Sequence, residues 1–397
     1  MKYIYISQFH DNCGYGSAAR GNLRSMQHYF PPEKLKILSL SLETVHSHIT
    51  ESDKEMLDKY DLSNKEALYD FIEKEEYVIL WHMPPPMSEK VMNMKITQET
   101  FRKATDNLNI LAWEATKLPD RWVEIYKKRK TKNVIVPSVW NQTLFKDLDI
   151  KAHLIPHSLE EPRGLSKPMD LPLDFKKNFV VFSMSQWQHR KGYDTLIRAF
   201  CMEFGDVDNA CLLIKTYGII MSNYAISQAQ QARSIVDQAR LLKESIELEN
   251  GKKAVCKVIV IPKVIPEEEI NWLYEQSHVF ALATRGEGFG LTIAEATMSG
   301  LPVVVPDAGG HLDYLKNYKN KYFFKGCWSP YHSIPGYSCN MNWYEPDIIS
   351  IRKSLRNAYN DWTAGRLSRE RNNPIGFSEK EVGKRFKDVL EGAFEND

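Results

Sequence analysis

One stretch, Thr284 to Gly310, constrains the fold of this chain more than any other part of the sequence. The apolar run Val279 to Ala283 precedes it and predicts a buried strand. A loop with three glycines follows, then a helical pattern from about Leu291 to Ser299, then a second apolar run at Val303 to Val305. Strand, glycine loop, helix and strand in this order predict a βαβ unit of an α/β domain.

The loop before this helix offers an anion site that two acids flank. Free N–H groups and the positive dipole end of a helix suit a phosphate. Glu287 lies in the loop, and Glu295 lies one turn into the helix, ~6 Å along the axis from Leu291. A carboxylate can accept hydrogen bonds from vicinal hydroxyl groups, so each acid could hold a sugar. A phosphate site between two sugar-binding acids matches the arrangement of groups in a nucleotide-sugar. The alternative is a helix start whose dipole merely favours acids.

The spacing Glu287-x7-Glu295, within GEGFGL, EA, GLPVV and AGG, resembles the signature of retaining GT-B glycosyltransferases, especially family four, the glycosyl transferases of group 1. The resemblance implies that Glu287 lies against the transferred sugar and that Glu295 holds the ribose. It also implies that the loop and the start of the helix bind the donor diphosphate. The residues concerned are Gly288, Phe289, Gly290, Leu291 and Thr292.

A second motif, His189 to Phe200, follows a predicted strand and reads HRKGYDTLIRAF. It resembles the family motif in which a lysine, here Lys191, contacts the donor diphosphate. A leaving diphosphate gains charge as the glycosidic bond breaks, and fixed cations stabilise that charge. The family usually has a further arginine directly after the strand, which this chain lacks, and Arg190 is the expected substitute. We therefore predict catalytic roles for Glu287, Lys191 and Arg190. The alternative for the last two is a solvated cation pair.

Four further residues are expected on the donor side. The chain opens with a predicted strand, a loop containing Gly14 and Gly16, and a helix from Gly21 to Tyr29. The resemblance implies that this loop closes over the donor phosphates, and the alternative is a turn without ligand contact. Lys215 ends another predicted strand and is expected to face the cleft. The loop around Val264 is expected to contact the nucleobase through its backbone.

His82 and Glu114 are the candidates on the acceptor side. His82 ends the predicted strand Tyr77 to Trp81, and Glu114 ends the predicted strand Leu108 to Trp113. The carboxyl ends of strands in an open α/β sheet face the ligand crevice. A structural histidine bonded to the proline loop that follows is an equal alternative for His82. The family often has a histidine where Glu114 stands. The aromatic segment Tyr322 to Tyr344 is either a packed loop or an acceptor wall.

The resemblance implies an α/β GT-B fold with two Rossmann-like domains that face a central cleft. The proline-rich stretch 160–174 predicts the linker between them. We expect an acceptor-binding domain at 1–165 and a nucleotide-sugar-binding domain at 175–377. The last helix, at about 378–397, is expected to cross back to the first domain.

Charge and cysteine content constrain the partners and the compartment. Lys and Arg number 52 and Asp and Glu 51, so only local patches can indicate an anionic partner. The cluster Lys127, Lys128, Arg129 and Lys130 is either a solvated helix end or a contact for a phospholipid or nucleic-acid surface. The cysteines show no metal-ligand spacing, which favours a reduced cytosol. We expect a cytoplasmic protein without a membrane span, peripheral to the membrane if the cluster binds lipid. Asp147 and Asp149 match a D-x-D metal pattern by chance, and no metal cofactor is expected.

Together these patterns predict a retaining, metal-independent glycosyltransferase. The donor would be a UDP- or GDP-linked sugar, and the acceptor a hydroxyl of a glycan, lipid, protein or modified nucleic acid. The alternative is a non-catalytic nucleotide-sugar-binding or scaffold protein on the same fold. A phosphorylase would need a lysine-bound pyridoxal phosphate or an extra phosphate site, for which the sequence has no local sign. A dinucleotide-dependent dehydrogenase is disfavoured because neither glycine loop matches the dinucleotide fingerprint.

Overall fold

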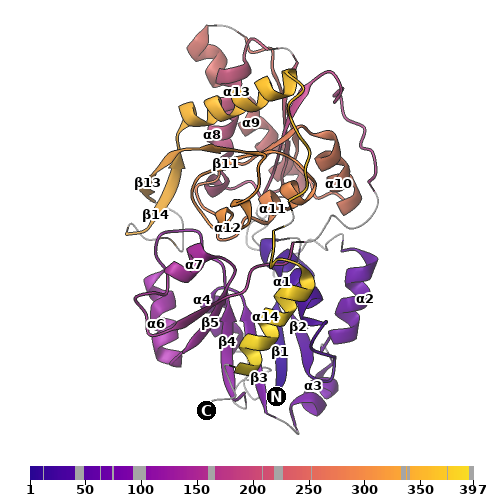
Figure 1. The fold of residues 1–397 in the computed structure, drawn as a ribbon, viewed down its shortest axis with the longest axis vertical. Coiled ribbons are helices and arrows are strands. Elements are labelled where there is room, and N and C mark those ends of the chain that lie inside the picture. The colour runs from indigo at the N-terminus through magenta and orange to yellow at the C-terminus, as the bar shows by residue number, and fades with distance from the viewer. Residues whose placement is uncertain are drawn as a thin grey trace. The chain divides into compact units, whose positions relative to one another are not determined.

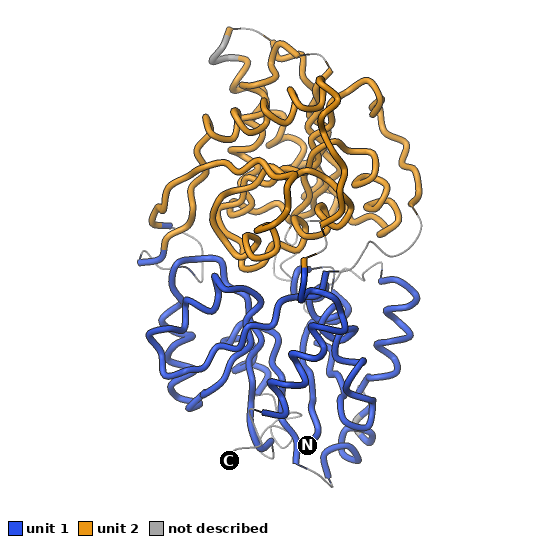
Figure 2. The backbone as a smooth tube through the Cα atoms, viewed as in Figure 1, with its two compact units in different colours: residues 1–160, 331–341, 375–397 blue, residues 161–330, 342–374 orange. Residues whose placement is uncertain are grey.

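A computed structural model describes residues 1–11, 13–40, 49–62, 64–73, 76–92, 104–159, 166–207, 209–218, 227–251, 253–331, 337, 340–372 and 374–392. The backbone forms two compact units (Figure 2). Unit 1 comprises Met1–Glu160, Tyr331–Met341 and Ile375–Asp397, and unit 2 comprises Glu161–Pro330 and Asn342–Pro374. Residues 160–165, the first part of the expected linker, lie outside the described residues.

Unit 1 is built on a six-stranded sheet in which all neighbouring strands are parallel. In spatial order its strands are β2 (Leu35–Ser39), β1 (Lys2–Ser7), β3 (Tyr77–His82), β4 (Asp106–Ile110), β5 (Asn133–Val136) and β6 (Lys151–Leu154). The described helices are α1 (Gly14–Met26), α2 (Glu51–Tyr60), α3 (Lys65–Ile72), α4 (Pro85–Met92), α6 (Asp120–Arg129), α7 (Val139–Thr143) and α14 (Glu379–Gly392) (Figure 1). The central strand β3 is buried along its whole length, because a parallel sheet is covered on both faces.

The C-terminal helix α14 returns to unit 1, as the sequence predicts, and lies alongside α1 (Figure 1). Val382, Phe386 and Leu390 join the hydrophobic core that contains β1 and α1. The helix starts with a capping box, in which the Glu381 N–H donates to Ser378 Oγ and Glu381 accepts from the Ser378 N–H. At Gly383 the two backbones come so close that a Cβ would lie 2.0 Å from the carbonyl oxygen of Ser25.

Gly383→Ala should therefore separate α14 from α1, although alanine is the better helix former. We expect a loss of about 1–3 kcal/mol of stability in unit 1, the usual cost of overpacking a core. Gly392→Ala is the matched control, since a Cβ there would meet nothing within 4 Å. Thermal unfolding of both variants tests this, and equal melting temperatures would show that the contact does not hold the helix.

Unit 2 also contains a six-stranded sheet with parallel neighbours. In spatial order its strands are β12 (Lys321–Phe324), β11 (Val303–Pro306), β10 (Val279–Ala281), β7 (Phe179–Met184), β8 (Ala210–Lys215) and β9 (Lys257–Ile261). The hairpin β13 (Gly326–Pro330) and β14 (Asn342–Pro346) forms a separate antiparallel sheet. The described helices are the 3₁₀ turn η1 (His189–Lys191), α8 (Tyr193–Phe204), α9 (Gln228–Asn250), α10 (Glu267–Gln276), α11 (Leu291–Met298), α12 (Leu312–Leu315) and α13 (Ile348–Thr363).

The strand order locates the ligand edge of each unit. Counted along the chain, unit 2 has the Rossmann order 3-2-1-4-5-6, so its topological switch point lies between β7 and β10. Unit 1 begins in the flavodoxin-like order 2-1-3-4-5, which places its switch point between β1 and β3. Ligands of such sheets bind outside the carboxyl ends of the strands at the switch point. The loops after β7 and β10, and those after β1 and β3, are therefore the places to search.

Candidate functional site

At the switch point of unit 2, the loop after β7 lies directly against the loop after β10. The Arg285 N–H donates to the carbonyl oxygen of Arg190 over 2.7 Å, which joins the two loops. Gly192 follows η1 with a φ of 66°, and a Cβ there would lie 1.8 Å from the carbonyl oxygen of Ala283. Only glycine accepts both the left-handed conformation and this close approach. Gly192 thus allows the turn that carries Lys191 to lie against the end of β10.

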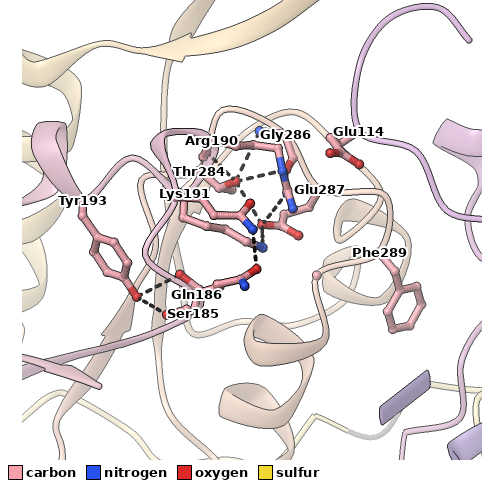
Figure 3. Close-up of polar contacts among 12 residues, drawn as sticks. Glu114, Ser185, Gln186, Arg190, Lys191, Tyr193, Thr284, Gly286, Glu287 and Phe289 are labelled. Carbon is pink, nitrogen blue, oxygen red and sulfur yellow. Dashed lines mark hydrogen bonds and ion pairs between the residues drawn. The ribbon is translucent and has the colours of Figure 1, made fainter. Parts of the chain in front are cut away.

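The three predicted catalytic residues come together in this place (Figure 3). Lys191 Nζ lies 2.6 Å from Glu287 Oε1, and Thr284 donates its hydroxyl proton to the same oxygen over 2.9 Å. Arg190 Nη1 lies 3.6 Å from that oxygen and also donates to the carbonyl of Gly286 over 2.6 Å. Figure 3 shows Lys191 and Arg190 both directed toward Glu287.

The cations decide the charge state of the Glu287 carboxyl. Burial, with 6% of the residue exposed, would by itself raise its pKa. The charges of Lys191 and Arg190 and the hydrogen bonds of Lys191 and Thr284 outweigh burial, so the pKa of Glu287 lies below its ordinary value. Glu287 is therefore an ionised carboxylate across the neutral range.

A buried arginine next to these residues was not predicted from the sequence. The Arg285 side chain, 3% exposed as a residue, donates to both Asp194 oxygens and to both Glu345 oxygens at 2.7 to 3.0 Å. It also donates to the carbonyl oxygen of His189 over 2.5 Å. Arg285 thus fastens the η1 turn, which carries Lys191, to β14. No sequence pattern could indicate this contact, because Glu345 lies 60 positions from Arg285.

Glu295 and Lys215 form a second charged group in unit 2. Tyr274 donates its hydroxyl proton to Glu295 over 3.0 Å. Dehydration by the surrounding protein raises the pKa of Glu295 to about 7, although solvent reaches the side chain. Lys215 ends β8, is 5% exposed, and lies with its ammonium 5.2 Å from the ring centre of Tyr217. Burial lowers the pKa of Lys215 to about 8, and the Glu295 charge acts in the opposite direction.

The glycine loop contributes backbone rather than side chains. Gly290 is the N-cap of α11, and Leu291 and Thr292 are its first two residues, whose N–H groups have no partner within the helix. The Phe289 ring is 3% exposed, packs 5.1 Å from the Tyr314 ring, and points away from Glu287 in Figure 3. Gly288 is buried in the same loop, and Val264 lies half-buried in the segment after β9.

Gly14 and Gly16 belong to unit 1 and require a correction of the expected secondary structure. They lie in the first turn of α1, which begins at Gly14 rather than at the expected Gly21. The Cys13 sulfur starts this helix early, because it accepts the Gly16 N–H at 3.4 Å as an N-cap. The segment predicted to be a loop is therefore helical.

Glu114 also lies in unit 1, beyond a strand that is shorter than expected. β4 ends at Ile110 because the Asn141 side chain bonds both the N–H and the carbonyl of Trp113, in place of a neighbouring strand. Tyr337 donates its hydroxyl proton to Glu114, and its ring stacks 4.8 Å from that of Trp113. Part of the aromatic segment is thus packed against the residue expected to bind the acceptor.

The basic cluster sits at the end of α6, in its last turn and at its C-cap, Lys130. Arg129 donates to Ser88 over 3.0 Å, and Lys128 lies 3.7 Å from Glu89. Asp149 forms an exposed ion pair with Lys132 at 2.7 Å. Within the described ranges, no three His, Cys, Asp or Glu side chains gather as metal ligands would. None of the helices described there has an apolar stretch long enough to cross a bilayer.

Comparison with known proteins relates unit 2 to one family. Residues 172–331 match the family model of glycosyl transferases group 1. A sucrose synthase of Melioribacter roseus is 30% identical over 149 residues, which are 36% of this chain and only 18% of that relative.

Solved structures show the same fold over the full length. The sucrose-phosphate synthase of Thermosynechococcus elongatus matches with a TM-score of 0.64 at 14% identity, covering 100% of both chains. A structure described as trehalose-6-phosphate from E. coli bound with UDP-2-fluoro glucose matches with a TM-score of 0.55 at 12% identity, over 100% of this chain and 96% of that one. The chain therefore has the GT-B fold, and its residues 172–331 match the glycosyl transferases of group 1.

Proposed function

We propose that this protein is a retaining glycosyltransferase that moves a sugar from a nucleotide-sugar to a hydroxyl group without a bound metal. The observation that carries this proposal is the convergence of Glu287, Lys191 and Arg190 at the switch point of unit 2. The adjoining start of α11 and Glu295 supply the two further elements that a nucleotide-sugar needs, a phosphate site and a ribose acceptor. Unit 2 is thus the proposed donor domain and unit 1 the proposed acceptor domain.

The proposed reaction begins with an exchange of ion pairs. The Lys191 ammonium lies 2.6 Å from Glu287 Oε1. A donor diphosphate carries more negative charge than one carboxylate, so Lys191 and Arg190 would turn their charges toward its oxygens. Their stabilisation increases as the bond from the anomeric carbon to the phosphate oxygen breaks, because negative charge then accumulates on the diphosphate.

The acceptor oxygen would bond to the anomeric carbon on the face that the diphosphate leaves. The proton of the acceptor hydroxyl passes to the departing phosphate oxygen, so no protein base is consumed. Glu287 keeps the Thr284 hydrogen bond and, as an ionised carboxylate, accepts hydrogen bonds from hydroxyls of the transferred sugar. Cations in place of a metal are consistent with a metal-independent reaction.

The donor and acceptor are proposed as classes. UDP- and GDP-sugars are the donors to test first, since one structural neighbour was solved with UDP-2-fluoro glucose. The acceptor can be a glycan, lipid, protein or modified nucleic acid. Among these, saccharides come first, because a relative that is 30% identical over 149 residues is named a sucrose synthase.

Release of nucleoside diphosphate from a panel of UDP-, GDP- and ADP-sugars, with and without saccharide acceptors, tests the proposal. We expect release with at least one donor, little change on adding EDTA, and a product with the anomeric configuration of the donor by NMR. Donor binding without release in any mixture would favour a scaffold protein. Complete loss with EDTA would contradict metal independence.

The role of Glu295 yields a separate prediction for nucleotide binding. UDP, or GDP if it binds more tightly, is compared with its 2′,3′-dideoxy form by calorimetry. A hydrogen bond to a charged group contributes about 1.5–3 kcal/mol, so removal of the hydroxyls should weaken wild-type binding roughly 10- to 100-fold. Glu295→Gln should bind both forms with similar, weak affinity, while the control Glu268→Gln on the exposed side of α10 should behave as wild type.

The pH dependence of this binding follows from the raised pKa of Glu295, about 7. A protonated carboxyl loses the charge that strengthens its bonds to the ribose. Wild-type affinity for the nucleotide should therefore fall more steeply as the pH drops through about 7 than the affinity of Glu295→Gln, in which the terminal phosphate of the nucleotide still titrates. A discrimination between the ribose and dideoxy forms that survives in Glu295→Gln would remove Glu295 from the ribose site.

A further inference from the structure

Unit 1 contains a buried chain of polar side chains that the proposed reaction does not explain. It runs through His157, Asn22, Tyr5 and His82, with exposed fractions of 5%, 1%, 0% and 2%. His157 Nδ1 lies 3.3 Å from Asn22 Oδ1, and Asn22 Nδ2 lies 3.2 Å from the Tyr5 hydroxyl. The Tyr5 hydroxyl in turn lies 2.7 Å from His82 Nδ1. Buried polar groups that are linked in this way polarise one another and hold one arrangement.

The hydrogen bonds of the chain have one direction. The Asn22 amide accepts from His157 with its oxygen and donates to Tyr5 with its nitrogen. The Tyr5 oxygen accepts a hydrogen bond from Asn22, so its own O–H donates a hydrogen bond to His82 Nδ1. That nitrogen is then an acceptor without a proton.

Burial keeps the histidines neutral. It lowers the pKa of His157 to about 4 and the pKa of His82 well below its ordinary value, and the nearby His157 lowers the latter further. A neutral imidazole carries one proton. Since Nδ1 of His82 accepts from Tyr5, the proton of His82 is on Nε2.

His82 lies where its Nε2–H group could donate a hydrogen bond to a ligand. His82 is the last residue of β3, and the Ser7 hydroxyl at the end of β1 donates to its carbonyl oxygen over 3.0 Å. These two strand ends define the switch point of unit 1. No hydrogen bond to His82 Nε2 is found among the described residues, and Nε2 is not one of the fully buried polar atoms that lack a partner. His82 is 2% exposed, so at most an edge of its ring meets solvent at this end of the sheet.

We propose that Tyr5, Asn22 and His157 hold His82 in the tautomer with its proton on Nε2, so that His82 presents a fixed N–H donor to an oxygen of a sugar acceptor. Tyr5, Asn22 and His157 are positioning residues, and His82 is the group that meets the ligand. The identity of the ligand rests on the proposed function. The tautomer does not, because it follows from contacts within unit 1.

NMR of the full chain labelled with ¹⁵N in its histidines measures the tautomer directly. The chain has 11 histidines, and the signals of His82 are those that disappear in His82→Gln. We expect a protonated Nε2 and an unprotonated Nδ1, with no titration near neutral pH. Tyr5→Phe removes the proton that Nδ1 accepts, so His82 should become a mixture of tautomers. A wild-type His82 with its proton on Nδ1, or an unchanged tautomer in Tyr5→Phe, would overturn the proposal.

Tyr3→Phe is the matched control for this experiment. Tyr3 lies two positions earlier on β1, is 3% exposed, and also loses a buried hydrogen bond when truncated, its 3.2 Å bond to the carbonyl of Leu390. Tyr3 does not belong to the hydrogen-bonded group of His157, Asn22, Tyr5 and His82. The signals of His82 should be the same in Tyr3→Phe and in the wild type, so a shift in both variants would indicate a general loosening of the strand.

Kinetics test what the fixed donor does. With a nucleotide-sugar and an acceptor that the wild type uses, Tyr5→Phe should raise the KM of the acceptor roughly 3- to 10-fold, the worth of one hydrogen bond. His82→Gln retains an N–H near the place of Nε2 and should keep more acceptor affinity than His82→Leu. Equal losses of acceptor affinity in His82→Gln and His82→Leu would contradict the role of His82 as a hydrogen-bond donor. If no donor is consumed at all, the proposed function fails and the tautomer is still decided by NMR.

Discussion

Glu287→Gln should lower the turnover of the active donor by a factor of about 10² to 10³, the usual effect of removing one well-placed electrostatic group. The amide is isosteric and keeps a partner for the Thr284 hydroxyl, so the loop should stay folded. It lacks the charge that orders Lys191 and Arg190 in the free enzyme and that holds the sugar hydroxyls in the complex. Steady-state rates at saturating donor measure the effect.

Glu244→Gln is the control for this variant. Glu244 lies on α9, is exposed, and forms only a loose pair with Arg240 at 3.9 Å. Its rates should equal those of the wild type. Wild-type turnover in Glu287→Gln, with the protein folded, would remove Glu287 from the reaction.

Lys191→Ala should lower kcat/KM by about 10³ and should also weaken nucleoside diphosphate binding. The variant loses the cation that the proposed mechanism places on the leaving diphosphate. Lys191→Arg should recover part of the activity, because a guanidinium also binds phosphate oxygens. If Lys191 were purely structural, the variant would lose stability but would keep the nucleotide affinity of the wild type.

The same substitution has a signed effect on stability. Lys191 lowers the pKa of Glu287 against the effect of burial, so the pair contributes stability above the unfolded pKa of Glu287 and loses it as the pH falls through the folded one. Removing Lys191 leaves a buried carboxylate with Arg190 alone, at a cost of up to about 3 kcal/mol at pH 7. The difference in melting temperature from the wild type should therefore narrow toward pH 4. A difference that is constant over this range would mean that Glu287 carries no charge-dependent stability.

Local sequence patterns were enough to predict those elements that neighbouring residues form by themselves. Apolar runs predicted β3, β10 and β11 closely, and the two-domain GT-B fold is confirmed by the strand orders and by structural neighbours. The spacing from Glu287 to Glu295 could be read as a phosphate site between two acids because a helix start and its loop occupy consecutive residues.

Other features depend on partners far apart in the chain. Arg285 is a clamp only because Asp194 and Glu345 reach it from 91 and 60 positions away. The early start of α1 depends on a cysteine acting as an N-cap, which is a rare residue for that position. The hydrogen-bonded chain from His157 to His82 joins two strands, a helix and the segment that follows β6. No periodicity or motif in the sequence records such contacts.

A crystal structure with a slowly reacting donor, a 2-fluoro form of the sugar nucleotide that the protein consumes, tests the assignment of donor contacts most directly. The donor diphosphate should lie within hydrogen-bond distance of Lys191 and of the first N–H groups of α11. Its ribose hydroxyls should lie on Glu295 and its sugar against Glu287. A donor bound elsewhere, with Lys191 still 2.6 Å from Glu287 and no phosphate in contact with it, would contradict the assignment.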